Sequence, residues 1–128
     1  MEPQTSVSKL NIKIEVHGKG NVFGQIFRHL APITLNSVVR NMPLKGRANK
    51  FKNQFVYIIL AIIIGTEKAK KKLQRGDIGF LSSNGALCFF LEDCEVAMPI
   101  NPLGTVTSGL DVLMNIKAGD VILIDICS

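Results

Sequence analysis

Residues 10–27 read LNIKIEVHGKGNVFGQIF, and this stretch sets the class of fold. Within residues 10–16 every even-numbered position is apolar and every odd-numbered position is polar, a period of two that is typical of a β-strand with one buried face. Two glycines, Gly18 and Gly20, then supply the positive φ angles that a tight turn needs, and the chain returns through residues 22–27. The stretch therefore predicts a β-hairpin that begins a one-sided sheet.

The length and composition of the chain limit the number of domains and the amount of disorder that it can have. With 128 residues, of which 47% are hydrophobic and 20% charged, the chain can bury enough apolar surface to offset the entropy lost on ordering. We expect a single domain over residues 1–128. Residues 1–8 have no apolar segment behind a basic one, so we expect a short flexible tail there and no signal peptide.

Three cysteines, Cys88, Cys94 and Cys127, give an odd count without CxxC spacing. This pattern argues against a disulfide framework and a zinc site, and we expect reduced thiols in a cytoplasmic protein. His17 and His29 have no ligand or triad partner at a recognisable spacing. Since no phosphate-loop, zinc-protease or serine-hydrolase motif occurs either, we expect no metal and no cofactor.

Residues 55–64, FVYIILAIII, form an uncharged and almost wholly apolar run. A helix needs roughly 20 such residues to cross a membrane, so we expect no membrane contact. Six of the ten residues are β-branched, and such side chains pack well on a pleated surface. The run therefore predicts a buried strand.

Other short elements follow from periodicity and from turn residues. Apolar side chains at intervals of three and four predict a helix over residues 32–42, which Pro43 ends. The Asn84-Gly85 pair predicts the turn of a second hairpin. The hairpin strands are expected at residues 78–81 and 86–91, a second short helix at residues 110–116, and a last strand at residues 121–126.

Three segments are expected to lie outside regular structure. Residues 45–52 form a basic stretch with little periodicity, expected as a solvated, mobile loop. Residues 67–75 are rich in lysine and suit a helical turn on the surface. Residues 92–102 contain acids and two prolines, expected as a loop or an irregular edge. Many short strands with two short helices predict an all-β barrel or sandwich with helical caps.

The net charge of +5 indicates one alternative kind of partner. Clustered lysines can meet phosphates through nonspecific electrostatics, so nucleic-acid binding is an alternative. No aromatic RNA-binding motif accompanies them, and charged loops commonly serve solubility. The two clusters comprise Lys45, Arg47, Lys50 and Lys52, and Lys68, Lys70, Lys71, Lys72 and Arg75.

Three segments resemble cyclophilins, and more closely the small prokaryotic cyclophilin-like proteins. Residues 103–113, LGTVTSGLDVL, look like the family's Phe-Gly-x-Val-x-x-Gly-x-x-Val-hydrophobic stretch. Residues 84–91, NGALCFFL, are similar to its Asn-Gly-Ser-Gln-Phe-Phe-Ile segment with one extra residue, and residues 32–34, PIT, to the Pro-x-Thr that opens its first helix. Residues 76–79, GDIG, resemble a Gly-Asp-x-Gly pattern of the small prokaryotic group. The resemblance implies a closed antiparallel β-barrel capped by two short helices.

The resemblance also bears on catalysis. In true cyclophilins a Phe-x-Arg-hydrophobic-hydrophobic strand places an arginine over the substrate's proline, where it weakens the amide resonance that opposes rotation. The matching residues 55–59 read FVYII, so Tyr57 takes the arginine position, and a neutral phenol cannot make the same charge-assisted donation. Ile100 replaces the groove histidine. We therefore predict no catalytic residue and no efficient prolyl isomerase activity.

By the same resemblance, the chain should carry an apolar groove. We expect a binding module whose groove holds a peptide or a small apolar ligand, with a weak prolyl isomerase and a nucleic-acid-binding protein as alternatives. The sequence gives no indication of an oligomeric state. The predicted groove residues are Phe55, Tyr57, Phe90, Met98 and Ile100, of which Phe90 matches the family's proline-pocket phenylalanine.

Alternation along the strand that contains Phe89 and Phe90 gives a further expectation. Neighbours in a strand point to opposite faces, so Phe89 should pack inside the barrel while Phe90 faces the groove. Replacing Phe89 by alanine should then cost more stability than replacing Phe90.

Overall fold

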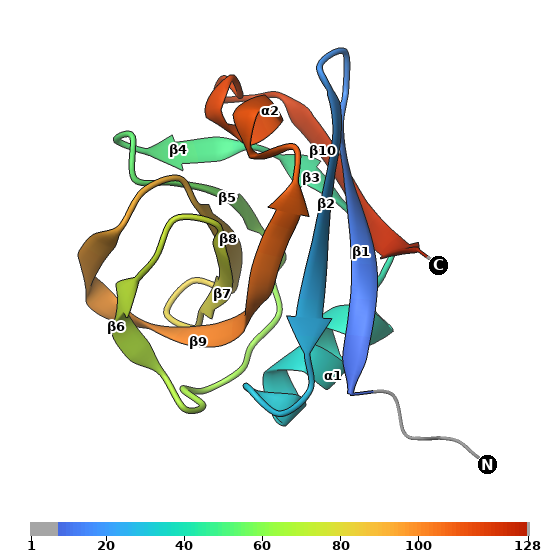
Figure 1. Ribbon diagram of the computed structural model, residues 1–128. Helices are drawn as coiled ribbons and strands as arrows, with labels where there is room; N and C mark the ends of the chain where they lie inside the picture. Colours follow the sequence, from blue (N-terminus) through green and yellow to red (C-terminus); the bar gives the residue numbers. More distant parts are fainter. Residues whose placement is uncertain (1–7, 128) are drawn as a thin grey trace.

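The computed structural model describes residues 8–127, which form a mainly β protein with ten antiparallel strands and two short helices (Figure 1). The predicted tail at residues 1–8 lies outside the described residues, except for Ser8. The elements are β1 (Lys9–Val16), β2 (Gly20–Phe27), α1 (Pro32–Arg40), β3 (Leu44–Arg47), β4 (Asn49–Phe51), β5 (Phe55–Ile59), β6 (Lys70–Leu73), β7 (Asp77–Leu81), β8 (Ala86–Phe90), β9 (Cys94–Ser108), α2 (Leu110–Met114) and β10 (Val121–Cys127).

The hairpin predicted from the alternating residues is confirmed. β1 pairs with β2 in register from Lys9↔Phe27 to Val16↔Gly20, and β10 pairs with the other edge of β1. Ile12 and Ile14 are 1% and 0% exposed, because the even-numbered side chains of β1 all face the core. The second predicted hairpin is also present, as β7 and β8 joined across the Asn-Gly turn.

The sheet does not close into the expected barrel. Among the described residues the paired strands run in the order β3-β10-β1-β2-β9-β7-β8-β5-β4, with β6 added beside β9, and no ladder joins β3 to β4. These two end strands are consecutive in the chain and meet at Ala48. Ala48 uses its backbone groups elsewhere, since its N–H donates to the Asp120 carbonyl and its own carbonyl accepts from the Gly119 N–H.

The basic stretch expected to be a mobile loop instead forms β3 and β4, so that expectation is wrong. β3 pairs with β10 and β4 pairs with β5. In β3 the side chains of Lys45 and Arg47 are exposed, while Gly46 faces Ile58 and Ala48 is buried. After the buried Leu44, the next two inward positions are a glycine and an alanine, so the sequence shows only a weak hydrophobic alternation here.

Two further expectations of irregular structure are wrong. The lysine-rich segment contains β6, an edge strand against β9, where lysines suit a strand with one unpaired side. The segment with two prolines lies within β9, which is 15 residues long. Its prolines are tolerated because the pairing shifts beside them: one shift lies between Ile78 and Gly79, where Gly79 faces Pro102, and another between Lys70 and Lys72.

The apolar run at residues 55–64 is a strand only in its first half. β5 ends at Ile59, which lies opposite Ala86, the first residue of β8. Beyond that point the partner strand has turned away, and the chain leaves the sheet with Ile63 99% exposed. The expected ten-residue buried strand is therefore wrong in its second half, because a strand extends only as far as its partner does.

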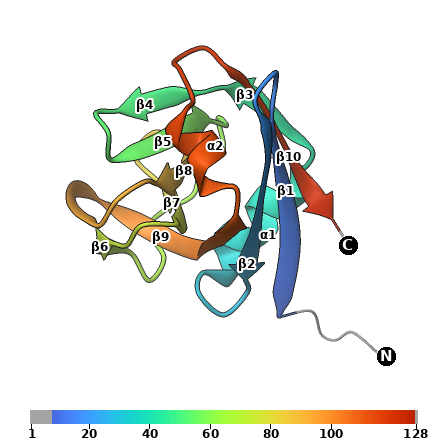
Figure 2. The same cartoon turned by 45° about the horizontal axis from the view of Figure 1, so that its top comes forward.

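The helices cover opposite ends of the sheet (Figures 1 and 2). The buried side chains divide into two clusters. α1 begins at Pro32 as predicted and ends at Arg40, two residues before the predicted end. The larger cluster fills the space between the helices and the sheet and includes Phe80 and Phe89. The smaller cluster lies on the other face of β5 and β8 and contains Phe55, Leu73, Ala86, Cys88, Phe90 and Ile100.

The N-terminus of α1 is capped by a residue far along the chain. Ile33 N–H and Thr34 N–H donate to the two carboxylate oxygens of Glu67 at 3.0 and 2.8 Å, and the Thr34 hydroxyl donates to the same carboxylate at 2.7 Å. The buried Asn101 completes the network, since its amide donates to the Thr34 hydroxyl and its oxygen accepts from Glu67 N–H. Glu67 thereby ties α1 to β9.

Replacing Glu67 by glutamine should lower the free energy of unfolding by about 1 kcal/mol, the usual size of a helix-capping interaction. Partial burial alone would raise the pKa of Glu67, but its hydrogen bonds and the nearby Lys68 outweigh burial and hold this pKa below 4.5. The carboxylate therefore stabilises the fold fully above pH 4.5 and less as the pH falls through its lowered pKa.

Urea unfolding of both proteins from pH 7 down to pH 3 measures this effect. The difference between wild type and Glu67→Gln should be constant at neutral pH and shrink at acidic pH. Glu92→Gln is the control, since Glu92 is exposed and caps no helix. A Glu67→Gln protein as stable as wild type at pH 7 would show that the cap contributes nothing.

Candidate functional site

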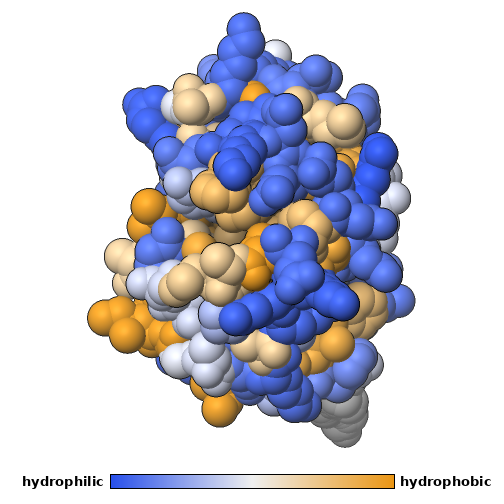
Figure 3. Space-filling model, turned by 90° about the vertical axis from the view of Figure 1, so that its left-hand side faces the viewer, coloured by the Kyte–Doolittle hydropathy of each residue, from blue (hydrophilic) through white to orange (hydrophobic). Residues whose placement is uncertain are grey.

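An apolar groove of about 480 Å³ lies between the β4–β5 turn and the first half of β9. β5 and β7 supply its floor and the β7–β8 turn one end. Figure 3 shows the side of the molecule that carries β4, β6 and the bend of β9, with a hollow near its centre between apolar and hydrophilic side chains. The lining residues are Phe51, Lys52, Gln54, Phe55, Tyr57, Leu81, Asn84, Glu95, Val96, Ala97, Met98 and Ile100.

A row of aromatic rings forms one wall of the groove. The rings of Phe51 and Phe55 stack with their centroids 5.2 Å apart, and the rings of Phe55 and Tyr57 are tilted at 5.8 Å. Pairing explains the row, because Phe51 lies opposite Phe55 across the β4–β5 ladder, and Tyr57 follows Phe55 on the same face of β5. Phe51 is 45% exposed, so part of this wall is open to a ligand.

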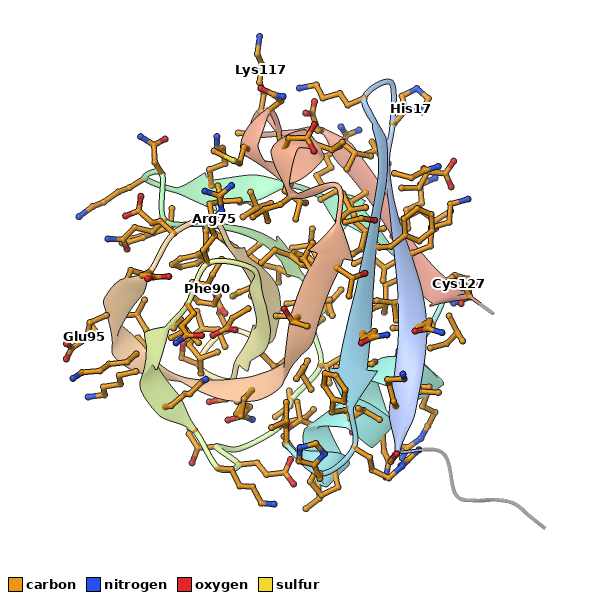
Figure 4. All side chains as sticks on the ribbon, viewed as in Figure 1. His17, Arg75, Phe90, Glu95, Lys117 and Cys127 are labelled. Carbon is orange, nitrogen blue, oxygen red and sulfur yellow. The ribbon has the colours of Figure 1, made fainter. Side chains whose placement is uncertain are left out.

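Phe90 lies beneath the groove and does not line it. Its ring contacts that of Phe55 at 5.0 Å between centroids, and Figure 4 shows it inside the ring of strands that β7, β8 and β9 describe. Phe90 is 0% exposed, as is Phe89. The predicted alternation holds, since Phe89 packs in the larger cluster and Phe90 in the smaller one, but the expectation that Phe90 is the more exposed ring is wrong.

The structure brings the other predicted groove residues together. Phe55, Tyr57, Met98 and Ile100 all line the groove, and Met98 is 47% exposed. Phe51 is not among the groove residues predicted from the sequence, because the basic stretch around it is expected there to be a loop. The polar residues 52–54 between Phe51 and Phe55 were the available signal, since a hairpin turn there places the two rings opposite each other.

Polar groups border the groove without partners among residues 8–127. The side chains of Gln54, Asn84 and Tyr57 make no hydrogen bond to another described residue. The Lys52 ammonium lies 5.4 Å from the centroid of the Phe51 ring, a cation–π contact, and no described carboxylate forms an ion pair with it. The groove therefore combines an apolar body with polar and cationic groups at its border.

Neither Cys88 nor Cys94 is suited to nucleophilic chemistry. Burial raises the pKa of the Cys88 thiol to about 12, so it stays protonated and packs as a small hydrophobe. Burial and the carboxylates of Glu92 and Asp93 also raise the pKa of Cys94. Within residues 8–127 no three His, Cys, Asp or Glu side chains gather as a metal site would require, and no helix is long and apolar enough to span a bilayer.

The two basic clusters lie on different strands. Lys45 and Arg47 project from β3 beside β10, where they and His17 border a shallow hollow of about 460 Å³. The second cluster is centred on β6, and its Lys70 pairs with Asp77 at 3.7 Å. The first cluster continues as Lys50 and Lys52, which flank the exposed Phe51 at the end of β4. Nucleic-acid binding stays a prediction of the sequence.

These features define a mainly antiparallel β protein with two helical caps. The family model for cyclophilin-like proteins matches residues 9–125, and the chain therefore belongs to the cyclophilin-like family. A comparison with the sequences of curated proteins gives no significant match.

Solved structures that resemble the chain include an archaeal protein and a complex of McbB. The hypothetical protein AF2241 from Archaeoglobus fulgidus, solved in solution, superposes with a TM-score of 0.80 and 16% sequence identity, covering 95% of this chain and 98% of that one. McbB in complex with tryptophan superposes with a TM-score of 0.70 and 16% identity, covering 89% of this chain and 44% of McbB. At this identity the likenesses show a shared fold.

Proposed function

We propose that the protein is a binding module whose groove holds a small, flat, apolar ligand. The observation that carries the proposal is the partly exposed row of rings from Phe51 through Phe55 to Tyr57. Such a wall offers stacking and edge contacts to another ring, and a mostly apolar groove with few polar groups is the usual form of a small-molecule site. The structure of McbB with tryptophan supports the choice, because 44% of the McbB chain shares this fold and McbB binds an aromatic amino acid.

On this proposal the protein is not an efficient prolyl isomerase. Tyr57 occupies the position at which the resemblance to cyclophilins would place an arginine, and a phenol offers no cationic, forked set of N–H donors. The groove therefore has no guanidinium to donate to a proline nitrogen. We expect the rate of cis–trans isomerisation of a proline peptide to stay near the uncatalysed rate in a coupled peptide assay, and clear catalysis that Tyr57→Ala abolishes would contradict this expectation.

Indole titration tests the groove directly. The chain has no tryptophan and one tyrosine, so light absorbed mainly by indole excites the ligand with little protein background. Phe51→Ala should weaken indole binding about fivefold to tenfold, the range expected when a ring at the centre of a contact is truncated. Because Phe51 is 45% exposed, its loss should leave the fold intact.

Phe23→Ala is the matched control for this experiment. Phe23 is 39% exposed on β2 and does not line the groove. Its replacement removes the same ring from a similarly exposed strand position, and binding should stay at the wild-type level. Equal losses in the two variants, or no saturable binding of indole to the wild type, would remove the proposal.

A further inference from the structure

We infer that the groove selects ligands that carry a carboxylate beside their apolar ring, and that Lys52 is the residue that recognises the carboxylate. This inference rests on the proposed function and adds a chemical class to it. Lys52 follows Phe51 directly, and its ammonium lies 5.4 Å from the centroid of that exposed ring. A ligand ring placed against Phe51 would bring its own substituents close to this ammonium.

The charge of Lys52 is available to a ligand. No carboxylate among residues 8–127 forms an ion pair with Lys52, although other lysines of the fold do have such partners, as Lys19 has Asp120 at 2.7 Å. Lys52 contacts an aromatic ring but no carboxylate, so its positive charge is not neutralised at the border of the apolar surface.

The one carboxylate among the lining residues does not offset Lys52. Glu95 lies on β9 directly opposite Lys72 of β6 in the strand register, and side chains at such paired positions lie on the same face of the sheet. Figure 4 shows the Glu95 side chain pointing outward from β9. The amides of Gln54 and Asn84 are neutral and can donate to an anion as well. The border of the groove therefore favours a negative group over a positive one.

The position of Lys52 is fixed by the turn that carries it. Lys52 adopts a φ of +53°, and the turn closes with a hydrogen bond from Gln54 N–H to the Phe51 carbonyl at 3.1 Å. This backbone path sets where the lysine stem leaves the turn, next to the Phe51 ring. A side chain of similar length at the same position can therefore keep the packing while removing the charge.

Two ligands that have the same ring system and nearly the same shape, but differ in charge, test the inference. Indole-3-propionate carries a carboxylate, and indole-3-propionamide replaces it with a neutral amide. We expect the acid to bind about fivefold more tightly than the amide at low salt, the upper range of a single solvent-exposed ion pair. Raising the salt concentration should shrink this preference because exposed charges are screened.

The variants Lys52→Met and Lys50→Met complete the test. Lys52→Met keeps an unbranched stem beside Phe51 and should bind acid and amide equally. Lys50 is a β4 lysine that does not line the groove, so Lys50→Met should keep the full preference for the acid. Tryptamine, the cationic analogue, should bind no better than the amide.

The outcomes separate this inference from the function on which it rests. Binding of both ligands with equal affinity to the wild type, or a preference for the acid that survives in Lys52→Met, would overturn the role of Lys52 and leave the groove as a ligand site. Failure of both ligands to bind would overturn the proposed function and this inference together.

Discussion

Replacing Phe90 by alanine should lower the free energy of unfolding by about 4 kcal/mol, close to the effect of Phe89→Ala, since truncating a fully buried phenylalanine costs about 3–5 kcal/mol. Both rings are 0% exposed, although they belong to different clusters on opposite faces of β8. The Phe90 ring also supports Phe55 from below at 5.0 Å. Its loss should therefore disturb the groove as well as the stability.

Guanidinium unfolding followed by circular dichroism measures both variants, with Phe51→Ala as the exposed-ring control at about 1 kcal/mol. Indole titration of the folded variants then separates their effects on binding. Phe90→Ala should weaken binding because the wall behind Phe55 is lost, whereas Phe89→Ala should bind normally. A Phe90→Ala protein that loses less than half the stability lost by Phe89→Ala would show that the smaller cluster packs loosely.

Gly104→Ala should destabilise the protein by about 3 kcal/mol or more, or prevent folding, because a clash with backbone atoms can be relieved only by shifting a strand. A β-carbon at Gly104 would lie 1.8 Å from the Gln25 carbonyl oxygen and 2.7 Å from the Ile26 α-carbon. β2 and β9 pair at this point, with Ile26 directly opposite Gly104. The close approach of the two backbones requires the absence of a side chain.

Gly65→Ala is the matched control for this experiment. A β-carbon there meets nothing within 4 Å, so the same substitution should change the free energy of unfolding by less than about 1 kcal/mol. Thermal or urea unfolding of the two variants gives the comparison. A Gly104→Ala protein as stable as Gly65→Ala would show that β2 and β9 can separate at this point without cost.

The contrast between β1 and β3 shows how far sequence reasoning reaches. β1 carries isoleucines at alternate positions, and those side chains are buried as their period predicts. β3 is equally a strand, but after the buried Leu44 its inward positions are Gly46 and, just beyond its end, Ala48. Burial of a glycine and an alanine adds little to a hydrophobic pattern, so the exposed lysine and arginine dominate this part of the sequence.

The groove, too, is only partly predictable from the sequence. The resemblance of residues 55–59 and 84–91 to cyclophilin segments named Phe55, Tyr57 and Phe90 as its members. The structure adds Phe51 to the aromatic row through the β4–β5 ladder. It also shows that Phe90 does not line the groove but packs beneath it, since Phe55 covers the Phe90 ring. Depth within a cluster depends on what packs on top, and one strand's alternation does not contain that information.

Local sequence is enough to predict the two hairpins, the start of α1, the mainly antiparallel fold and the family, because each depends on short-range periodicity, turn residues or motifs. Contacts between distant segments fix where β5 ends, that β3, β4 and β6 are strands, that the sheet stays open at Ala48, and that Glu67 caps α1. Each of these depends on a hydrogen-bonding or packing partner far away in the chain, and a backbone group takes whichever partner the folded chain brings to it.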